Sequence, residues 1–210
     1  MKKKFELSHC KIINKSLFIK KQENELIYFN ENKLITSYKH FPDKFIHNWL
    51  KDPEIKVYDD IGIYPNNDKC PANQYNTWIP FECDNDTPFI YKQDSIDIFL
   101  KHLRILCGNE EDIFDYFIKW NAQMIQYPEI KTIVPTLISN EGAGKGSYLL
   151  TMKKILGFSK VFETSNPSRD VWGSFNGMMC QCFLVNCNEL SKKDSQEAQG
   201  RIKHLLQIHH

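Results

Sequence analysis

Residues 132–147 read TIVPTLISNEGAGKGS, and this stretch decides the expected fold. Its first half is rich in β-branched residues and predicts a buried strand, whose members include Thr132, Ile133, Val134 and Ile138. A glycine-rich loop, Gly142–Gly144, follows, and Lys145 opens a predicted helix. Strand, loop and helix in this order direct unpaired N–H groups and the positive end of the helix dipole to one point. The stretch therefore predicts an anion-binding loop of the P-loop kind.

Two positions differ from the P-loop pattern G-x-x-x-x-G-K-[ST]. Ser139 stands in place of the first glycine, and Gly146 stands in place of the hydroxyl residue that follows the lysine. The nearest hydroxyl is on Ser147, but successive helical side chains point about 100° apart. We therefore expect nucleotide binding at this loop to depend only modestly on magnesium.

A second short apolar run, CFLVNC at residues 182–187, predicts a strand that ends at Asn188 and Glu189. P-loop enzymes use such a strand to place a carboxylate opposite the γ-phosphate. Glu189 is therefore the candidate to polarise an attacking water, and Asn188 stands where a magnesium-binding Asp is common but offers only a neutral oxygen. The alternative for Glu189 is an acid that favours the start of a following helix.

Several segments together resemble the superfamily 3 helicases of the poxvirus primase-helicase type, a group that serves large DNA viruses, phages and plasmids. The resemblance extends from about residue 45 onward and lies in the order of its segments. They are WLKDPEIKVYDDIGIYP (49–65), CPANQYNTWIPF (70–81), HLRILCGNEEDIFDYFIKWNAQMIQYPEIK (102–131), SNEGAGKGS (139–147), ILGF (155–158), VWGSFN (171–176) and FLVNCNEL (183–190).

The resemblance implies a ring-forming ATPase that uses ATP and Mg²⁺ and moves along single-stranded DNA during replication. It implies that Lys145 contacts the β- and γ-phosphates and that Glu189 is the Walker B carboxylate, with Ser147 and Asn188 as magnesium ligands. The residues that would surround the triphosphate are Asn140, Glu141, Gly142, Ala143, Gly144, Lys145, Gly146 and Ser147.

Family members continue with a strand that bears a polar sensor residue and with an arginine that completes a neighbour's site. This sequence stops at His210 before either feature, so we expect a truncated core with poor ring assembly and little or no ATP hydrolysis. The competing function is a truncated, non-catalytic nucleotide-binding or interaction module. A P-loop small-molecule kinase would need arginines in a lid after the core, where only Arg201 is available.

Composition narrows the class of protein. The 210 residues are 41% hydrophobic and carry a formal charge of +1, so contacts with DNA must come from local patches. No apolar stretch approaches the ~20 residues of a membrane span, and the N-terminus lacks a secretory signal. Seven scattered cysteines without a C-x-x-C pair predict reduced thiols and an intracellular, cytoplasmic protein, at a viral replication site if viral. Cys70 and Cys83 alone make a poor zinc site.

The expected architecture is α/β: a partial P-loop NTPase (AAA+-like) core, preceded by a helical pair and a turn-rich mixed region. These parts correspond to residues 131–210, 93–130 and 1–92. Short antiparallel strands are expected over residues 5–40, followed by a brief helix over residues 41–50. The helical pair has apolar faces, and we interpret its aromatic residues as core rather than as base-stacking groups; these faces comprise Ile96, Phe99, Leu100, Leu103 and Leu106 in the first helix and Ile113, Phe117, Trp120 and Met124 in the second.

Overall fold

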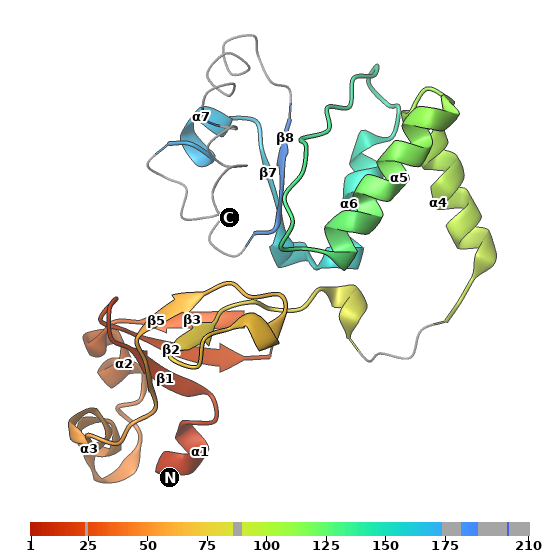
Figure 1. Cartoon of the computed structure of the whole chain (residues 1–210). Helices are drawn as coiled ribbons and strands as arrows, with labels where there is room; N and C mark the ends of the chain where they lie inside the picture. Colours follow the sequence, from red (N-terminus) through yellow and green to blue (C-terminus); the bar gives the residue numbers. More distant parts are fainter. Residues whose placement is uncertain (24, 86–89, 174–181, 189–200, 202–210) are drawn as a thin grey trace. The chain divides into compact units, whose positions relative to one another are not determined.

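The computed structural model describes residues 1–23, 25–85, 90–173, 182–188 and 201. The chain divides into two compact units, Met1–Pro80 and Phe81–His210, and each is described by itself (Figure 1). Both mix helices and strands, in agreement with the predicted α/β class. The described helices and strands are α1 (Lys2–Phe5), β1 (His9–Ile12), β2 (Leu17–Gln22), β3 (Glu25–Phe29), α2 (Glu31–Ser37), α3 (Phe45–Lys51), β4 (Val57–Tyr58), β5 (Asp60–Gly62), β6 (Gln74–Asn76), α4 (Gln93–Leu106), α5 (Glu111–Gln126), α6 (Lys145–Leu156), β7 (Val161–Thr164), α7 (Pro167–Asp170) and β8 (Leu184–Cys187).

The first unit is built on a four-stranded sheet with the strand order β3-β2-β1-β4. Strands β1, β2 and β3 form an antiparallel meander, in which Cys10 pairs with Ile19 and Phe18 pairs with Phe29. Strand β4 joins β1 in parallel, and β5 and β6 form a separate parallel pair. The short antiparallel strands predicted for the start of the chain are therefore confirmed.

Both faces of this sheet are covered, because neighbouring residues of a strand point to opposite sides. Phe18 faces a cluster formed with α1, α2 and α3, whereas Ile19 faces a cluster formed with the β5–β6 region (Figure 1). Two groups of buried side chains result: Phe5, Phe18, Phe29, Leu34, Ile46, Trp49 and Ile55 on the helical side, and Cys10, Ile12, Ile19, Leu26 and Ile79 on the other.

One prediction for this unit is wrong, since Leu34 and Ile35 lie in helix α2 rather than in a strand. The Asn30 side chain accepts a hydrogen bond of 2.8 Å from the Lys33 N–H, and this cap favours a helix start. Leu34 is completely buried, so the helix buries this apolar side chain as well as a strand would. The brief helix predicted for residues 41–50 is confirmed as α3, which ends at Lys51.

His9 makes the stability of the first unit depend on pH. The ring is buried, with Nδ1 3.0 Å from the Phe5 carbonyl oxygen and Nε2 2.6 Å from the Tyr38 hydroxyl. Burial lowers the pKa of His9 below its ordinary value of 6.5. The unfolded chain therefore binds a proton at this ring more readily than the folded chain does. The contribution of His9 to stability is fully present above pH 6.5 and is lost as the pH falls through the lowered pKa.

We expect urea unfolding of the first unit to show this loss as the pH falls from about 6.5 through the lowered pKa of His9. His9→Gln removes the titrating ring but keeps polar atoms, so part of the pH dependence should disappear. An identical pH dependence in the parent and in His9→Gln would show that this ring does not contribute.

In the second unit, α4 and α5 confirm the predicted helical pair. Gly108 has a φ of +67° and lies in the turn between them, where a left-handed backbone favours glycine. Leu103, Phe117 and Met124 are buried as expected. Ile113 is 55% exposed, and its neighbour Phe114 is buried in its place, so that part of the predicted face is wrong by one position.

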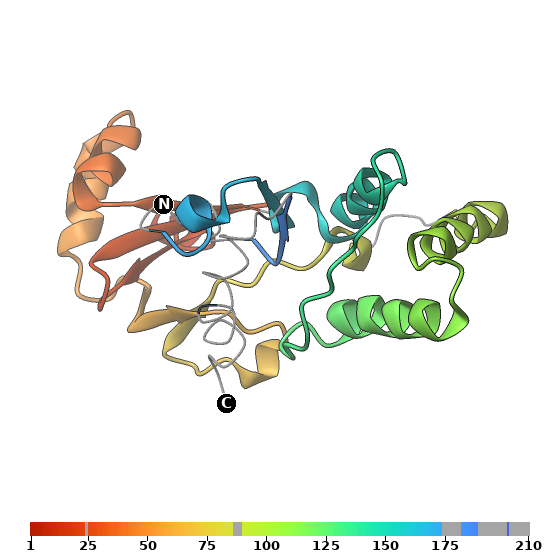
Figure 2. The same ribbon diagram turned by 90° about the horizontal axis from the view of Figure 1, so that it is seen from above.

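Strands β7 and β8 form a parallel pair in which Val161 is opposite Leu184. The strand predicted for residues 182–187 is thus confirmed, although it begins at Leu184. The strand predicted for residues 132–138 is wrong: the chain there is irregular, as Figure 2 shows between α5 and α6, and Ile138 is 90% exposed.

A strand needs a ladder partner for its N–H and C=O groups, and residues 132–138 pair with no strand in the described part of the chain. Side chains of α5 hold the neighbouring backbone instead. The Trp120 indole N–H donates to the Ile133 carbonyl at 3.3 Å, and the Gln123 amide donates to the Ile130 carbonyl at 3.0 Å.

No helix within the described ranges is long and apolar enough to cross a membrane.

Candidate functional site

The loop before α6 has the backbone shape that an anion site requires. Gly142 has a φ of +77° and Gly144 a φ of +94°, both in the left-handed region that favours glycine. Alternation of left-handed and ordinary residues turns successive N–H groups toward one side. A concavity of about 590 Å³ opens there, within the range of known ligand sites. It is lined by Ser139, Glu141, Gly142, Ala143, Gly144, Lys145, Gly146 and Ser147.

The Lys145 ammonium group lies across the mouth of this loop. Its Nζ is 2.6 Å from the Ser139 hydroxyl, 3.1 Å from the Ser139 carbonyl oxygen and 3.3 Å from the Asn140 carbonyl oxygen. Each of these partners is neutral, so the positive charge is not cancelled by a carboxylate. A phosphate in the concavity would therefore gain a strong charge-assisted contact when it replaces these oxygens.

Helix α6 supplies the other half of this candidate anion site. Its first internal hydrogen bond joins the Tyr148 N–H to the Gly144 carbonyl oxygen at 3.1 Å, which leaves the N–H groups of Lys145, Gly146 and Ser147 without a helical partner. The N-cap residue Gly144 provides no side-chain cap. These N–H groups and the helix dipole favour negative charge at this end.

Buried contacts fix the direction of α6. The Tyr148 hydroxyl donates to the Asn121 side-chain oxygen at 2.7 Å, and the Asn121 amide donates to the Phe117 carbonyl at 2.8 Å. Burial raises the pKa of Tyr148 far above its ordinary value, so the hydroxyl stays protonated and keeps donating. Met152 and Leu156 are almost completely buried on the same helix. The loop therefore leads into a helix that is packed through buried side chains.

His102 of α4 is a site residue that the sequence pattern did not reveal. Its Nε2 lies 3.0 Å from the Gly144 carbonyl oxygen, and this geometry fits an Nε2–H that donates to the carbonyl. A Cβ atom added to Gly144 would lie 2.1 Å from His102 Cε1, so the imidazole occupies the space that a side chain would need. The available signal was its spacing, because His102 follows the apolar Phe99 by three residues and precedes Leu106 by four.

Gly144→Ala should disturb the loop, while Gly146→Ala provides a matched control. A left-handed backbone costs a non-glycine residue about 1–2 kcal/mol, and the methyl group would also meet His102. A Cβ on Gly146 meets nothing within 4 Å. We expect Gly144→Ala to increase amide hydrogen exchange across the loop and Gly146→Ala to leave it unchanged. Equal exchange in both variants would contradict the role of Gly144.

Asn188, one predicted magnesium ligand, is engaged with its own sheet. Its backbone N–H donates to the Thr164 carbonyl at 2.8 Å, and its side-chain amide lies 3.4 Å from the Glu163 carboxylate. Its side-chain oxygen accepts from the Asn186 amide at 2.6 Å. No hydrogen bond joins Asn188 to Ser147 in the described ranges. Glu189, the predicted Walker B carboxylate, lies outside the described residues.

Glu163 on β7 is a second charged group that the sequence pattern did not single out. It pairs with Lys153 of α6, and this bond, with the Asn188 and Asn186 amides, keeps the pKa of Glu163 below its ordinary value. Glu163 is therefore ionised at neutral pH and ties α6 to the sheet.

Within the described part of the chain, no group of three His, Cys, Asp or Glu residues is arranged to hold a metal ion.

The fold is similar to that of the NrS-1 C-terminal region. Two solved apo structures of that region match with TM-scores of 0.70 and 0.66, each at 18% sequence identity and over 95% of this chain. This chain spans 47% and 46% of those two chains, or about half of their length. At this identity the match establishes a shared fold. No protein-family profile matches the chain, and no curated protein matches it.

Proposed function

We propose that this chain is the ATP-binding portion of a DNA replicative helicase of the superfamily 3 type. The observation that carries the proposal is the Lys145 ammonium group, whose partners among the described residues are neutral oxygens, at a left-handed glycine loop that opens helix α6. The order along the sequence of the segments that resemble this helicase family supports the assignment. The fold shared with the NrS-1 C-terminal region also supports it.

The loop and α6 have complementary tasks in this proposal. The free N–H groups of residues 145–147 would bind phosphate oxygens, and Lys145 would neutralise charge on the β- and γ-phosphates. Asn140 and Glu141 would border the triphosphate. The bond from His102 to the Gly144 carbonyl keeps the loop in the binding shape before the nucleotide arrives. Such preorganisation increases affinity because less ordering is needed on binding.

Hydrolysis requires further groups. Glu189 would polarise the attacking water, while Mg²⁺, held by Ser147 and Asn188, would neutralise developing charge on the phosphates. The geometry of β8 favours a second candidate at this point, a nucleotide-binding module without turnover. The Asn188 amide is neutral and is already bonded to Glu163 and Asn186, so the magnesium site lacks a free carboxylate at this position.

ATP hydrolysis with and without single-stranded DNA distinguishes the two candidates. DNA-stimulated turnover that Glu189→Gln removes would support the helicase motor, because the substitution keeps the shape but loses the negative charge. ATP binding without turnover in the parent would support the non-catalytic module. Failure of the parent to bind ATP at all would reject both.

A further inference from the structure

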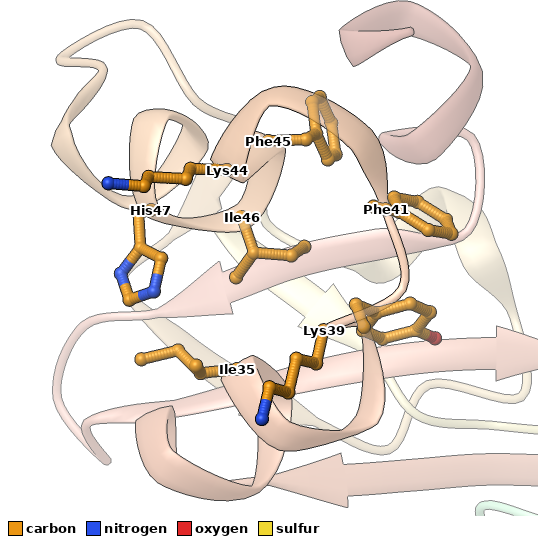
Figure 3. Close-up of a pocket in the computed structure, with 8 residues that line it drawn as sticks. Ile35, Lys39, Phe41, Lys44, Phe45, Ile46 and His47 are labelled. Atoms are coloured by element: carbon orange, nitrogen blue, oxygen red, sulfur yellow. The ribbon is translucent and has the colours of Figure 1, made fainter.

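A second concavity lies in the first unit, between helices α2 and α3 (Figure 3). Its volume is about 200 Å³, which is smaller than the ~300–1,000 Å³ of typical small-molecule sites. It therefore suits one planar ring system rather than a whole cofactor. The residues that line it are Ile35, Tyr38, Lys39, Phe41, Lys44, Phe45, Ile46 and His47.

Aromatic rings form a fixed wall of this pocket. The Phe41 ring packs against Tyr38 at 5.3 Å and against Phe45 at 5.7 Å between centroids. Phe5, which is buried, contacts all three of these rings. Each of the three remains only partly buried, so each keeps some accessible surface in the pocket. Such a wall provides a stacking partner for a planar group at little cost in side-chain ordering.

The rim of the pocket is cationic. Lys39, Lys44 and His47 are exposed, and no acidic residue is among the lining residues. Figure 3 shows Lys44 and His47 on the side opposite Phe41 and Phe45. Neither lysine side chain has a hydrogen bond or an ion pair with any other described residue. Their charges are therefore available to an anionic ligand.

The same segment is more basic than the chain as a whole. Residues 33–51 contain four lysines but only one acidic residue, Asp43, whereas the full chain has 27 Lys and Arg residues and 26 Asp and Glu residues. A nearly neutral protein has no general attraction to nucleic acid, so a local excess of this kind determines where a polyanion binds.

We propose that this pocket binds single-stranded DNA, with one base against the aromatic wall and neighbouring phosphates on Lys39 and Lys44. A stacking surface beside positive charge is the combination that binds unpaired nucleotides with little sequence preference. A base in a duplex keeps both faces covered by its neighbours and cannot enter the pocket. The choice of DNA over RNA rests on the proposed function, whereas the single-stranded ligand follows from the pocket itself.

Fluorescence anisotropy with a labelled oligothymidylate, in the absence of nucleotide, tests the proposal with the full chain. The double variant Lys39→Gln/Lys44→Gln should weaken binding about 10- to 30-fold at ~0.1 M salt and reduce the salt slope by about 1.4, or ~0.7 for each phosphate that no longer meets a lysine. Lys39→Arg/Lys44→Arg should keep near-parental affinity. Lys4→Gln/Lys21→Gln changes two exposed lysines of the same unit that do not line the pocket, and it should have little effect.

The aromatic wall is tested separately by Phe41→Leu, which keeps an apolar side chain but removes the stacking ring. It should weaken binding about five-fold or more, with parental thermal unfolding of the first unit as the check on folding. Because no nucleotide is present, this result does not depend on the loop before α6.

Three results would overturn the proposal. The first is a parent chain that does not bind the oligothymidylate at ~0.05 M salt. The second is an equal loss in the pocket pair and in the control pair, which would indicate diffuse charge attraction. The third is tighter binding of duplex DNA or of single-stranded RNA, which would reject the ligand named here. ATP binding by the loop could still be intact in each case, so failure of the two proposals can be distinguished.

Discussion

Lys145→Ala should lower the affinity of the chain for ATP and ADP about 10- to 150-fold. This range follows from the ~1.5–3 kcal/mol that a hydrogen bond to a charged group contributes. Lys145 is the positively charged residue among those that line the loop concavity, and its Nζ contacts, within the described part of the chain, the oxygens of Ser139 and Asn140. Its removal leaves the backbone N–H groups of the loop without a positively charged side chain beside them. Isothermal titration calorimetry measures the change directly.

Lys154→Ala is the matched control, because Lys154 lies on the same helix, is exposed and does not line the loop concavity. The affinity of the Lys154→Ala variant for nucleotide should equal that of the parent chain. Equal affinity of the parent and of Lys145→Ala would show that nucleotide, if bound, does not use this loop.

Trp49→Ala should destabilise the first unit by about 3–5 kcal/mol, the usual cost of removing a buried tryptophan. The ring is 2% exposed and packs against Phe5 at 5.1 Å and Phe18 at 5.8 Å between centroids. Its indole N–H donates to the Glu6 carboxylate at 2.9 Å. The loss is a large part of the ~5–15 kcal/mol that stabilises a typical domain.

Hydrogen exchange resolved by segment shows which part of the chain loses stability in Trp49→Ala. Amides of β1, β2 and β3 should lose protection in Trp49→Ala, because the core around Trp49 contains only residues of the first unit. Trp49→Phe keeps much of the ring volume and should lose far less protection. Unchanged protection of these strands in Trp49→Ala would contradict the packing described for this core.

Local patterns in the sequence predicted several elements well. The 3.6-residue spacing of apolar residues indicated α4 and α5, because amphipathic helices show their buried face directly in the sequence. Short apolar runs that alternate with polar residues indicated the antiparallel strands β1–β3. The glycines before Lys145 indicated a loop that turns its N–H groups to one side, and both Gly142 and Gly144 have a positive φ.

Features that depend on tertiary partners could not be predicted in this way. Residues 132–138 have strand composition, but a strand also needs a neighbour for its backbone, and the described part of the chain supplies none. The role of His102 depends on α4 lying beside the start of α6, and the spacing of His102 along α4 does not by itself show that contact. The basic, aromatic pocket between α2 and α3 was missed because Leu34 and Ile35 were expected in a strand.

The most direct test of the central claim, that this loop binds the triphosphate, is an NMR titration of the ¹⁵N-labelled chain with ATP. The amide signals of Gly142, Gly144 and residues 145–147 should shift in a saturable manner, and the shifts should disappear in Lys145→Ala. The N–H groups of that stretch are the proposed phosphate ligands, so they must report binding. Saturable shifts confined to other segments, such as residues 35–47, or no shifts at all, would contradict the account.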